Sequence, residues 1–243
     1  NTPHQQYVNK FNELKLKYNN YIQIFTDGSR MNNNTGATVV TDREATSFHL
    51  PNTASNYTAE IFSLLQAVQQ INNCPQPHKY IIFSDSISGI TATQQLYPKS
   101  TIIQNIQDRI HQAIIQGHEI ILAWVPAHVG IQGNELADLA AKQGAEPDFP
   151  LTHLDTPAND LNQLIKSTLC QLWKGEWLSV TNNKLRRIKT TVDNWIIPLP
   201  RQDQIKITRL RIGHCKASHK YILERRSPDY CELCNVQITA LHL

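Results

Sequence analysis

The chain has 243 residues, of which 40% are hydrophobic and 18% are charged, so it is long enough to bury at least one sizeable core. Apolar runs stay well short of the ~20 residues that cross a bilayer, and the N-terminus lacks a basic-then-apolar signal pattern, so we expect no membrane partner. Because the sequence begins at Asn1 rather than Met, we expect a fragment or processed product whose targeting signal, if any, lies outside it.

Charge and cysteines are both unevenly distributed. Residues 1–150 carry 9 Lys and Arg against 12 Asp and Glu, whereas residues 151–243 carry 14 against 8. This asymmetry favours a metal-dependent site followed by a segment that contacts nucleic acid, although basic surface helices without such a role are the plainer alternative. The cysteine count is five, and Cys215, Cys231 and Cys234 cluster near the C-terminus, which predicts an intracellular chain (cytoplasm or nucleus) rather than a disulfide framework.

Taken in chain order, the patterns predict strands first. After a lead-in over residues 1–20, β-rich runs at 21–26, 36–41 and 45–50 are separated by polar turns. A helix is predicted after Asn56, because apolar residues then recur at spacings of three and four: Ile61, Leu64, Leu65, Val68 and Ile71.

The next elements alternate between helix and strand. The continuous apolar run at 80–83 predicts a strand buried on both faces and parallel to its neighbours. Helical patterns at 86–96 and 101–116, a strand at 119–125 and a helix at 134–142 follow. This order predicts an α/β fold, a mixed five-stranded sheet flanked by helices.

The remainder of the chain has a different composition. Residues 147–158 contain three prolines and are predicted to be a linker. Beyond it, residues 159–243 are predicted to form a smaller, mainly helical and basic C-terminal region, with helical spacing over 160–180.

Four acids occupy comparable places in these elements. Asp27 and Asp85 follow predicted strands, and Glu60 and Asp138 lie near the starts of predicted helices. Strand ends and helix starts converge at the carboxyl edge of such a sheet, where four acids would repel one another unless cations neutralise them. Oxygen ligands of this kind suit Mg²⁺ or Mn²⁺. Each acid alone is more often a turn or capping residue, and Glu135 is expected to be solvated or capping.

The acids lie in four sequence blocks: Phe25-Thr26-Asp27-Gly28-Ser29, Tyr57-Thr58-Ala59-Glu60, Phe83-Ser84-Asp85-Ser86 and the long string from Trp124-Val125-Pro126-Ala127-His128 to Gly133-Asn134-Glu135-Leu136-Ala137-Asp138. In this order the blocks resemble the signatures of type 1 ribonuclease H, and most closely the domain at the end of non-LTR retrotransposon polyproteins. The resemblance implies a ribonuclease H-like domain over residues 21–146. It also implies an endonuclease that cuts the RNA strand of RNA–DNA hybrids, leaving 5′-phosphate and 3′-hydroxyl ends.

Residue roles follow from the same resemblance. Asp27, Glu60, Asp85 and Asp138 take the catalytic positions that bind two Mg²⁺ (or Mn²⁺) ions, and His128 takes the place of a mobile histidine that assists protons or product release. A reverse transcriptase domain of the same polyprotein is the expected partner.

Substrate contacts are expected beside the acids. An enzyme that distinguishes RNA from DNA must recognise the 2′-hydroxyl, and Gly28, Ser29, Asn56 and Ser86 resemble the residues that do so in the family. Each could equally be a cap, Asn56 especially. The basic hybrid-binding helix of cellular members is missing, because residues 87–122 contain only two basic residues, Lys99 and Arg109. The basic tail or a polymerase domain would then supply affinity.

The C-terminal end resembles a partial zinc knuckle of the same elements. Cys231-x-x-Cys234 and His242 are recognisable ligands, and the fourth would lie past Leu243 or be Cys215, His214 or His219, unless no Zn²⁺ binds. Some of the basic residues nearby are expected to contact phosphates: Arg186, Arg187, Lys189, Arg201, Lys206, Arg209 and Arg211. Trp173, Trp177 and Trp195 are expected to form a small core.

Two alternatives remain open. A decayed or domesticated copy would be a catalytically inactive nucleic-acid-binding module of the same fold, although all four acids are present. A 3′–5′ exonuclease or a transposase would share the architecture, but such exonucleases open with Asp-x-Glu where this chain has Asp27-Gly28-Ser29.

Overall fold

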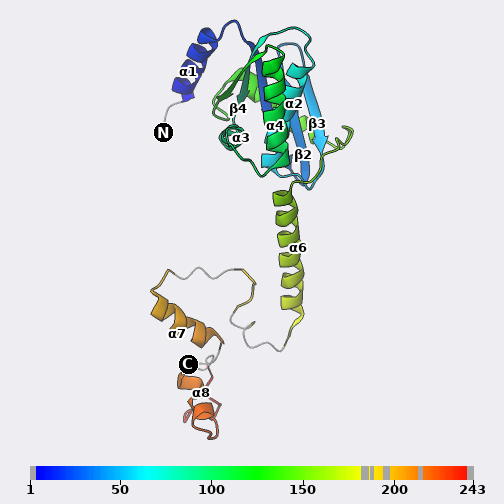
Figure 1. Cartoon of the computed structure of the whole chain (residues 1–243). Coiled ribbons are helices and arrows are strands. Elements are labelled where there is room, and N and C mark those ends of the chain that lie inside the picture. The colour runs from blue at the N-terminus through cyan, green and yellow to red at the C-terminus, as the bar shows by residue number, and fades with distance from the viewer. Residues whose placement is uncertain (1–3, 182–185, 187–188, 194–197, 213–215, 240–243) are drawn as a thin grey trace. The chain divides into compact units, whose positions relative to one another are not determined.

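A five-stranded sheet organises the first of two units into which the chain divides, Asn1–Leu164 and Ile165–Leu243. A computed structural model of the chain describes residues 4–181, 186, 189–193, 198–212 and 216–239. The strands are β1 (Ile22–Met31), β2 (Asn34–Val40), β3 (Ala45–Leu50), β4 (Lys79–Ser84) and β5 (Glu119–Trp124), in the order β3-β2-β1-β4-β5 (Figure 1).

The sheet is mixed because its connections differ. A two-residue turn at Asn32-Asn33 joins β1 to β2, and both residues have positive φ, 47° and 70°, as a tight turn between antiparallel strands requires. The strands β4 and β5 run parallel to β1 and to each other, so each is reached through a helical crossover.

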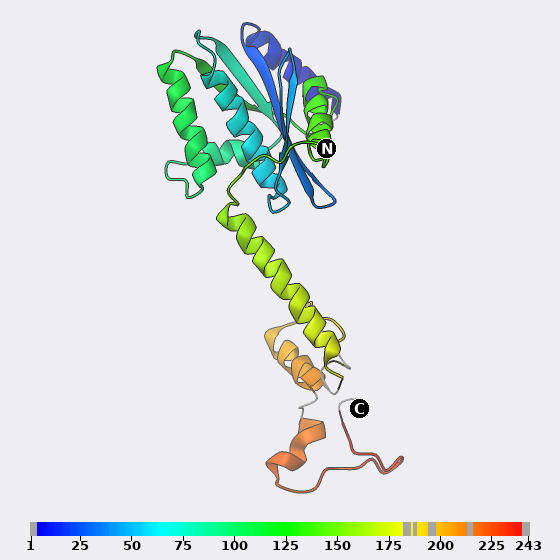
Figure 2. The ribbon, with the colours of Figure 1, turned by 90° about the vertical axis from the view of Figure 1, so that its right-hand side faces the viewer.

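Helices cover both faces of the sheet (Figure 2). The helices α2 (Asn56–Asn72), α3 (Ile87–Thr93) and α4 (Thr101–Ile115) contribute to a core that includes Ile24 and Ile82. On the other face, α1 (His4–Lys17) and α5 (Gln132–Gly144) pack over Phe25 and Phe83. Successive residues of one strand thus point into different cores, as the strand periodicity requires.

The predicted fold class is confirmed, and two local details differ. The lead-in contains helix α1, and β1 runs past Asp27 to Met31 instead of stopping there. The strand continues because Asp27 pairs with Thr38 of β2, whereas its parallel partner β4 ends opposite Thr26. Asp27 therefore still lies at the carboxyl edge of the parallel part of the sheet.

The proline-containing segment 147–158 runs alongside the edge strand β3. Leu151 forms a parallel bridge with His49, and the Thr152 amide donates to the His49 carbonyl at 2.7 Å. Leu154 packs against the core beneath. The boundary between the two units falls farther along, between Leu164 and Ile165.

The second unit contains helices with little buried surface. They are the later part of α6 (Ala158–Ser179), α7 (Arg201–Ile212) and α8 (Lys216–Leu223). Trp173 is 55% exposed, so the prediction that it belongs to a small core is wrong, since its helix buries only Asp160 among the described residues. Trp195 and Arg187 lie outside the described residues. No helix in the described part of the chain has the length and apolar character needed to cross a bilayer.

Candidate active site

Asp27 lies on β1 in a nearly closed environment, with 6% of its surface exposed. The next residue, Gly28, lies directly against helix α2. A Cβ at Gly28 would stand 2.3 Å from the Glu60 nitrogen and 2.5 Å from the Ala59 carbonyl carbon. The absence of a side chain therefore lets the backbone of α2 approach β1, which brings Glu60 close to Asp27.

The Glu60 carboxylate is held through both of its oxygens. Asn56, one turn earlier on α2, donates its side-chain amide to Oε1 at 2.7 Å, and the Ser86 hydroxyl donates to Oε2. Ser86 also accepts the Gly89 amide and so caps α3. The cap of α2 is Ser55 and not Asn56, which the sequence offered as an alternative to a substrate contact, since the Ser55 hydroxyl accepts the Thr58 amide at 3.2 Å.

Asp85 follows β4 directly and is held by residues from the last motif block. The Trp124 indole donates to the Asp85 carbonyl at 3.0 Å, and the Asn134 side chain donates to its carboxylate. Asn134 is 2% exposed, and its Oδ1 has no hydrogen-bond partner among the described residues. Sequence reasoning gave neither Trp124 nor Asn134 a role, although both belong to that block.

Asp138 lies on α5, and His128 lies in the loop before this helix. Lys142, one turn after Asp138, forms an ion pair with it at 2.6 Å. His128 is exposed and has a positive φ of 54°. Its Nδ1 lies 3.9 Å from a Glu135 oxygen, and the other Glu135 oxygen accepts the Gly130 amide at 3.2 Å. Glu135 therefore braces this loop instead of being merely solvated.

The four acids interact electrostatically. The pKa of Asp27 is raised to about 8, chiefly by burial and also by the charges of Asp85, Asp138 and Glu60, against the Gly28 amide, which lowers it. Burial also raises the pKa of Glu60 and of Asp85 above the ordinary range, while hydrogen bonds from Ser86 and from Asn134 respectively lower it. Acids from four separate elements thus share one environment, as their spacing predicted.

The comparison with known families agrees with this geometry. The family model of RNase H matches residues 19–146, slightly more than half of the chain. This chain belongs to the RNase H family. A similar protein is the Pol polyprotein of equine infectious anemia virus (strain Wyoming), which is 32% identical over 127 residues. That match covers 50% of this chain and 10% of the polyprotein.

Membership in the RNase H family confirms the resemblance on which the prediction rested, and it supports a hydrolase that acts on nucleic acids. Among the described residues, however, no group of three His, Cys, Asp or Glu side chains forms a ready-made metal site. The acids are within electrostatic reach of one another without being arranged around a single point. The oxygen donors of the four acids, and the raised pKa values of Asp27, Glu60 and Asp85, fit divalent cations, which would relieve the repulsion.

The four predicted substrate-binding residues of this RNase H domain differ in accessibility. Gly28, Ser29 and Ser86 are buried, whereas Asn56 is exposed. Contacts inside the protein explain the burial of two of them: Gly28 packs against the backbone of α2, and the Ser86 hydroxyl donates to Glu60. Asn56 is the one of the four that solvent reaches, and its side-chain amide also donates to Glu60.

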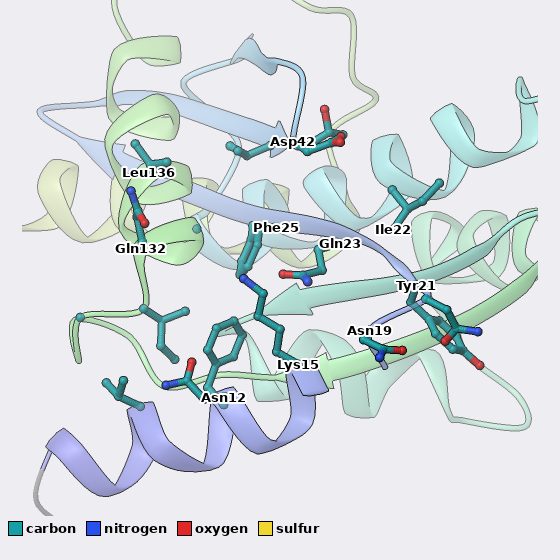
Figure 3. A pocket seen from close by; sticks show the side chains of 18 residues that line it. Asn12, Lys15, Asn19, Tyr21, Ile22, Gln23, Phe25, Asp42, Gln132 and Leu136 are labelled. Atoms are coloured by element: carbon teal, nitrogen blue, oxygen red, sulfur yellow. The ribbon is translucent and has the colours of Figure 1, made fainter. Parts of the chain in front are cut away.

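A separate hollow of about 730 Å³ lies between α1, β1 and the start of α5 (Figure 3). Figure 3 shows Asn12 and Lys15 of α1 beside it, with Gln132 and Leu136 contributed by α5. None of the four acids lines this hollow.

Gly28→Ala tests the close approach of β1 and α2. Because the new Cβ would overlap backbone atoms of Ala59 and Glu60, we expect the melting temperature to fall by several degrees and nuclease activity to be lost. Gly175→Ala is the matched control, since nothing lies within 4 Å of its Cβ position. A Gly28→Ala protein as stable and active as this control would contradict the packing role.

The raised pKa of Asp27 predicts how the stability of the metal-free protein depends on pH. The ordinary value of 3.8 becomes about 8 on folding, so between these values the folded state binds a proton that the unfolded state releases. The free energy of unfolding should therefore fall as pH rises from about 4 to about 8.

Asp27→Asn isolates this contribution because Asn keeps the volume and removes the charge. We expect the variant to be more stable than the natural protein near pH 8 and almost equally stable near pH 4, as measured by urea unfolding with a chelator present. Added Mg²⁺ should stabilise the natural protein at the higher pH and the variant much less. An equal stability difference at both pH values would contradict the assignment.

Proposed function

We propose that the chain is a metal-dependent endoribonuclease that cuts the RNA strand of RNA–DNA hybrids. The observation that carries this proposal is the electrostatic cluster of Asp27, Glu60, Asp85 and Asp138 at the carboxyl edge of the sheet. Family membership supports hydrolysis of nucleic acid in general, and the cluster supports the metal dependence.

Two Mg²⁺ or Mn²⁺ ions fit the oxygen donors of these four acids. Bound there, they would supply Lewis-acid chemistry and lower the pKa of a bound water. The donor set contains no His or Cys, which is consistent with a hard cation.

The protein's own groups prepare the acids for this task. Asn56 and Ser86 fix both oxygens of Glu60, and Asn134 fixes Asp85, so little reorganisation is needed when substrate arrives. His128 lies in an exposed loop braced by Glu135, where its ring can reach the solvent side of the cluster and exchange protons.

We further propose that this activity serves reverse transcription of a retrotransposon. The viral relative is a Pol polyprotein, and this chain spans about a tenth of it. A reverse transcriptase domain of the same polyprotein would then be the partner, and the reaction would take place inside the cell. Such a partner would also supply the affinity for the hybrid that cellular members obtain from their basic helix, which this chain lacks.

Cleavage of a labelled RNA–DNA hybrid tests the proposed activity. We expect Mg²⁺-dependent cutting by the natural protein, and a loss of at least about a hundredfold in Asp85→Asn, because a neutral amide cannot balance a cation. Asp108→Asn, on the exposed face of α4, is the matched control and should cut normally.

The same assay separates the alternatives. Hybrid binding without cutting by the natural protein would favour the inactive module. Digestion of single-stranded DNA from its ends would favour an exonuclease of this fold. Equal cutting by Asp85→Asn and Asp108→Asn would show that the acid cluster is not the active site.

We also propose that the C-terminal end binds Zn²⁺ through Cys231 and Cys234. The two residues lie in a tight hairpin in which the Cys231 amide donates to Val236 and the Asn235 amide donates to Cys231, both at 2.9 Å. Asn235 has a φ of 52°, which lets the chain reverse directly after the second cysteine. Pairs of cysteines two residues apart are common zinc ligands.

The remaining candidate ligands include His219, which lies in α8. Cys215, His214 and His242 lie outside the described residues. Zinc content of the purified full chain tests the proposal: we expect about one Zn²⁺ per chain, lost in Cys231→Ser and in Cys234→Ser. Cys170→Ser, exposed on α6, is the control and should retain the metal. A metal-free natural protein after purification with added Zn²⁺ would contradict it.

A further inference from the structure

The catalytic unit of this chain extends past the family match, which ends at residue 146. Residues 149–160, called the strap here, run beside residues 49–55. The His49 ring lies 3.2 Å from the Phe149 carbonyl, and the Thr53 and Thr156 hydroxyls are 3.1 Å apart. The Leu151–His49 bridge and the hydrogen bond from Thr152 to His49 add to these contacts. Later residues of the strap contact later residues of the other segment, so the two segments run in the same direction.

The last contact of the strap involves a buried charge that the proposed mechanism does not use. The Asp160 side chain is 5% exposed, and its Oδ2 accepts the Ser55 amide at 2.9 Å. Acidic side chains are rarely buried to this extent without a specific partner. Ser55 is the cap of α2, so this carboxylate lies at the positive end of that helix dipole, where a negative charge is stabilising.

The segment that the strap covers leads directly into the active site. Residues 51–55 connect β3 to α2, whose first turns carry Asn56 and Glu60. The Arg30 guanidinium donates to the carbonyls of Asn52 and Ala54 at 3.1 Å and 3.0 Å. The connection that leads into α2 is therefore held by Arg30 of β1 as well as by the strap.

We propose that Asp160 is a positioning residue for the nuclease reaction, acting through Ser55 and the first turn of α2 on Asn56 and Glu60. The strap thereby makes the start of the C-terminal region part of the catalytic unit. This inference rests on the proposed function, since it assumes that Glu60 takes part in hybrid cleavage.

Three variants of the full chain test the inference. Asp160→Ala removes the acceptor, and Asp160→Asn keeps an acceptor without the charge. Asp155→Ala is the matched control, because it removes an exposed acid from the same strap. We expect kcat for hybrid cleavage to fall about tenfold in Asp160→Ala, with KM nearly unchanged, and to be partly restored in Asp160→Asn. Asp155→Ala should match the natural protein.

Hydrogen exchange supplies a readout that does not depend on activity. Amides of residues 55–60 should exchange faster in Asp160→Ala than in Asp155→Ala, whereas those of β4 should be unchanged. If Asp160→Ala does not fold, Asp160→Asn tests the inference in its place. We then expect a smaller fall in kcat and a smaller increase in the exchange of residues 55–60.

Several results would overturn the inference. Equal kcat in the Asp160 and Asp155 variants would do so, and so would unchanged exchange at residues 55–60. Faster cleavage or a lower KM in Asp160→Ala would show instead that this charge opposes the substrate. An inactive natural protein with faster exchange in Asp160→Ala would contradict the proposed function and leave the structural link intact.

Discussion

The repulsion between one buried carboxylate and three partly buried ones is the constraint around which this domain is built. Folding brings Asp27, Glu60, Asp85 and Asp138 within electrostatic reach, and burial makes ionisation of the first three more costly still. A fold shaped only for stability would keep such groups apart. Their convergence therefore indicates that the site is completed by something positively charged, which is the physical basis of the proposed metal dependence.

The protein offsets part of this cost with neutral donors and one cation. Asn56 and Ser86 donate to Glu60, Asn134 donates to Asp85, and Lys142 pairs with Asp138. Donors of this kind fix the direction of a carboxylate while leaving its charge available to a ligand. They come from helices α2 and α5 and from the cap of α3, so the precision of the site depends on how these helices are anchored.

Sequence alone predicted the sheet, its flanking helices other than α1, and the convergence of the acids, because these follow from periodicities and motif order. It placed Asp27 at a strand end, since residue patterns do not show that β1 keeps pairing with β2 after β4 stops. It offered Asn56 as a possible cap of α2, whereas the cap is Ser55, because both residue types favour that position. The support from Asn134 was not predicted, since a buried side-chain contact between distant segments has no local signature.

The strap shows the same limit at a larger scale. Prolines at 147, 150 and 157 predicted a linker, and they do exclude regular structure, yet side-chain and backbone groups between them attach the segment to β3 and to α2. Proline removes a donor and restricts φ without preventing an extended segment from pairing at an exposed strand edge. A proline-rich composition that predicts a linker is thus compatible with a segment that packs against the domain. Asp160 lies thirteen residues after the first of these prolines, and through Ser55 it contacts the start of the helix that carries Glu60.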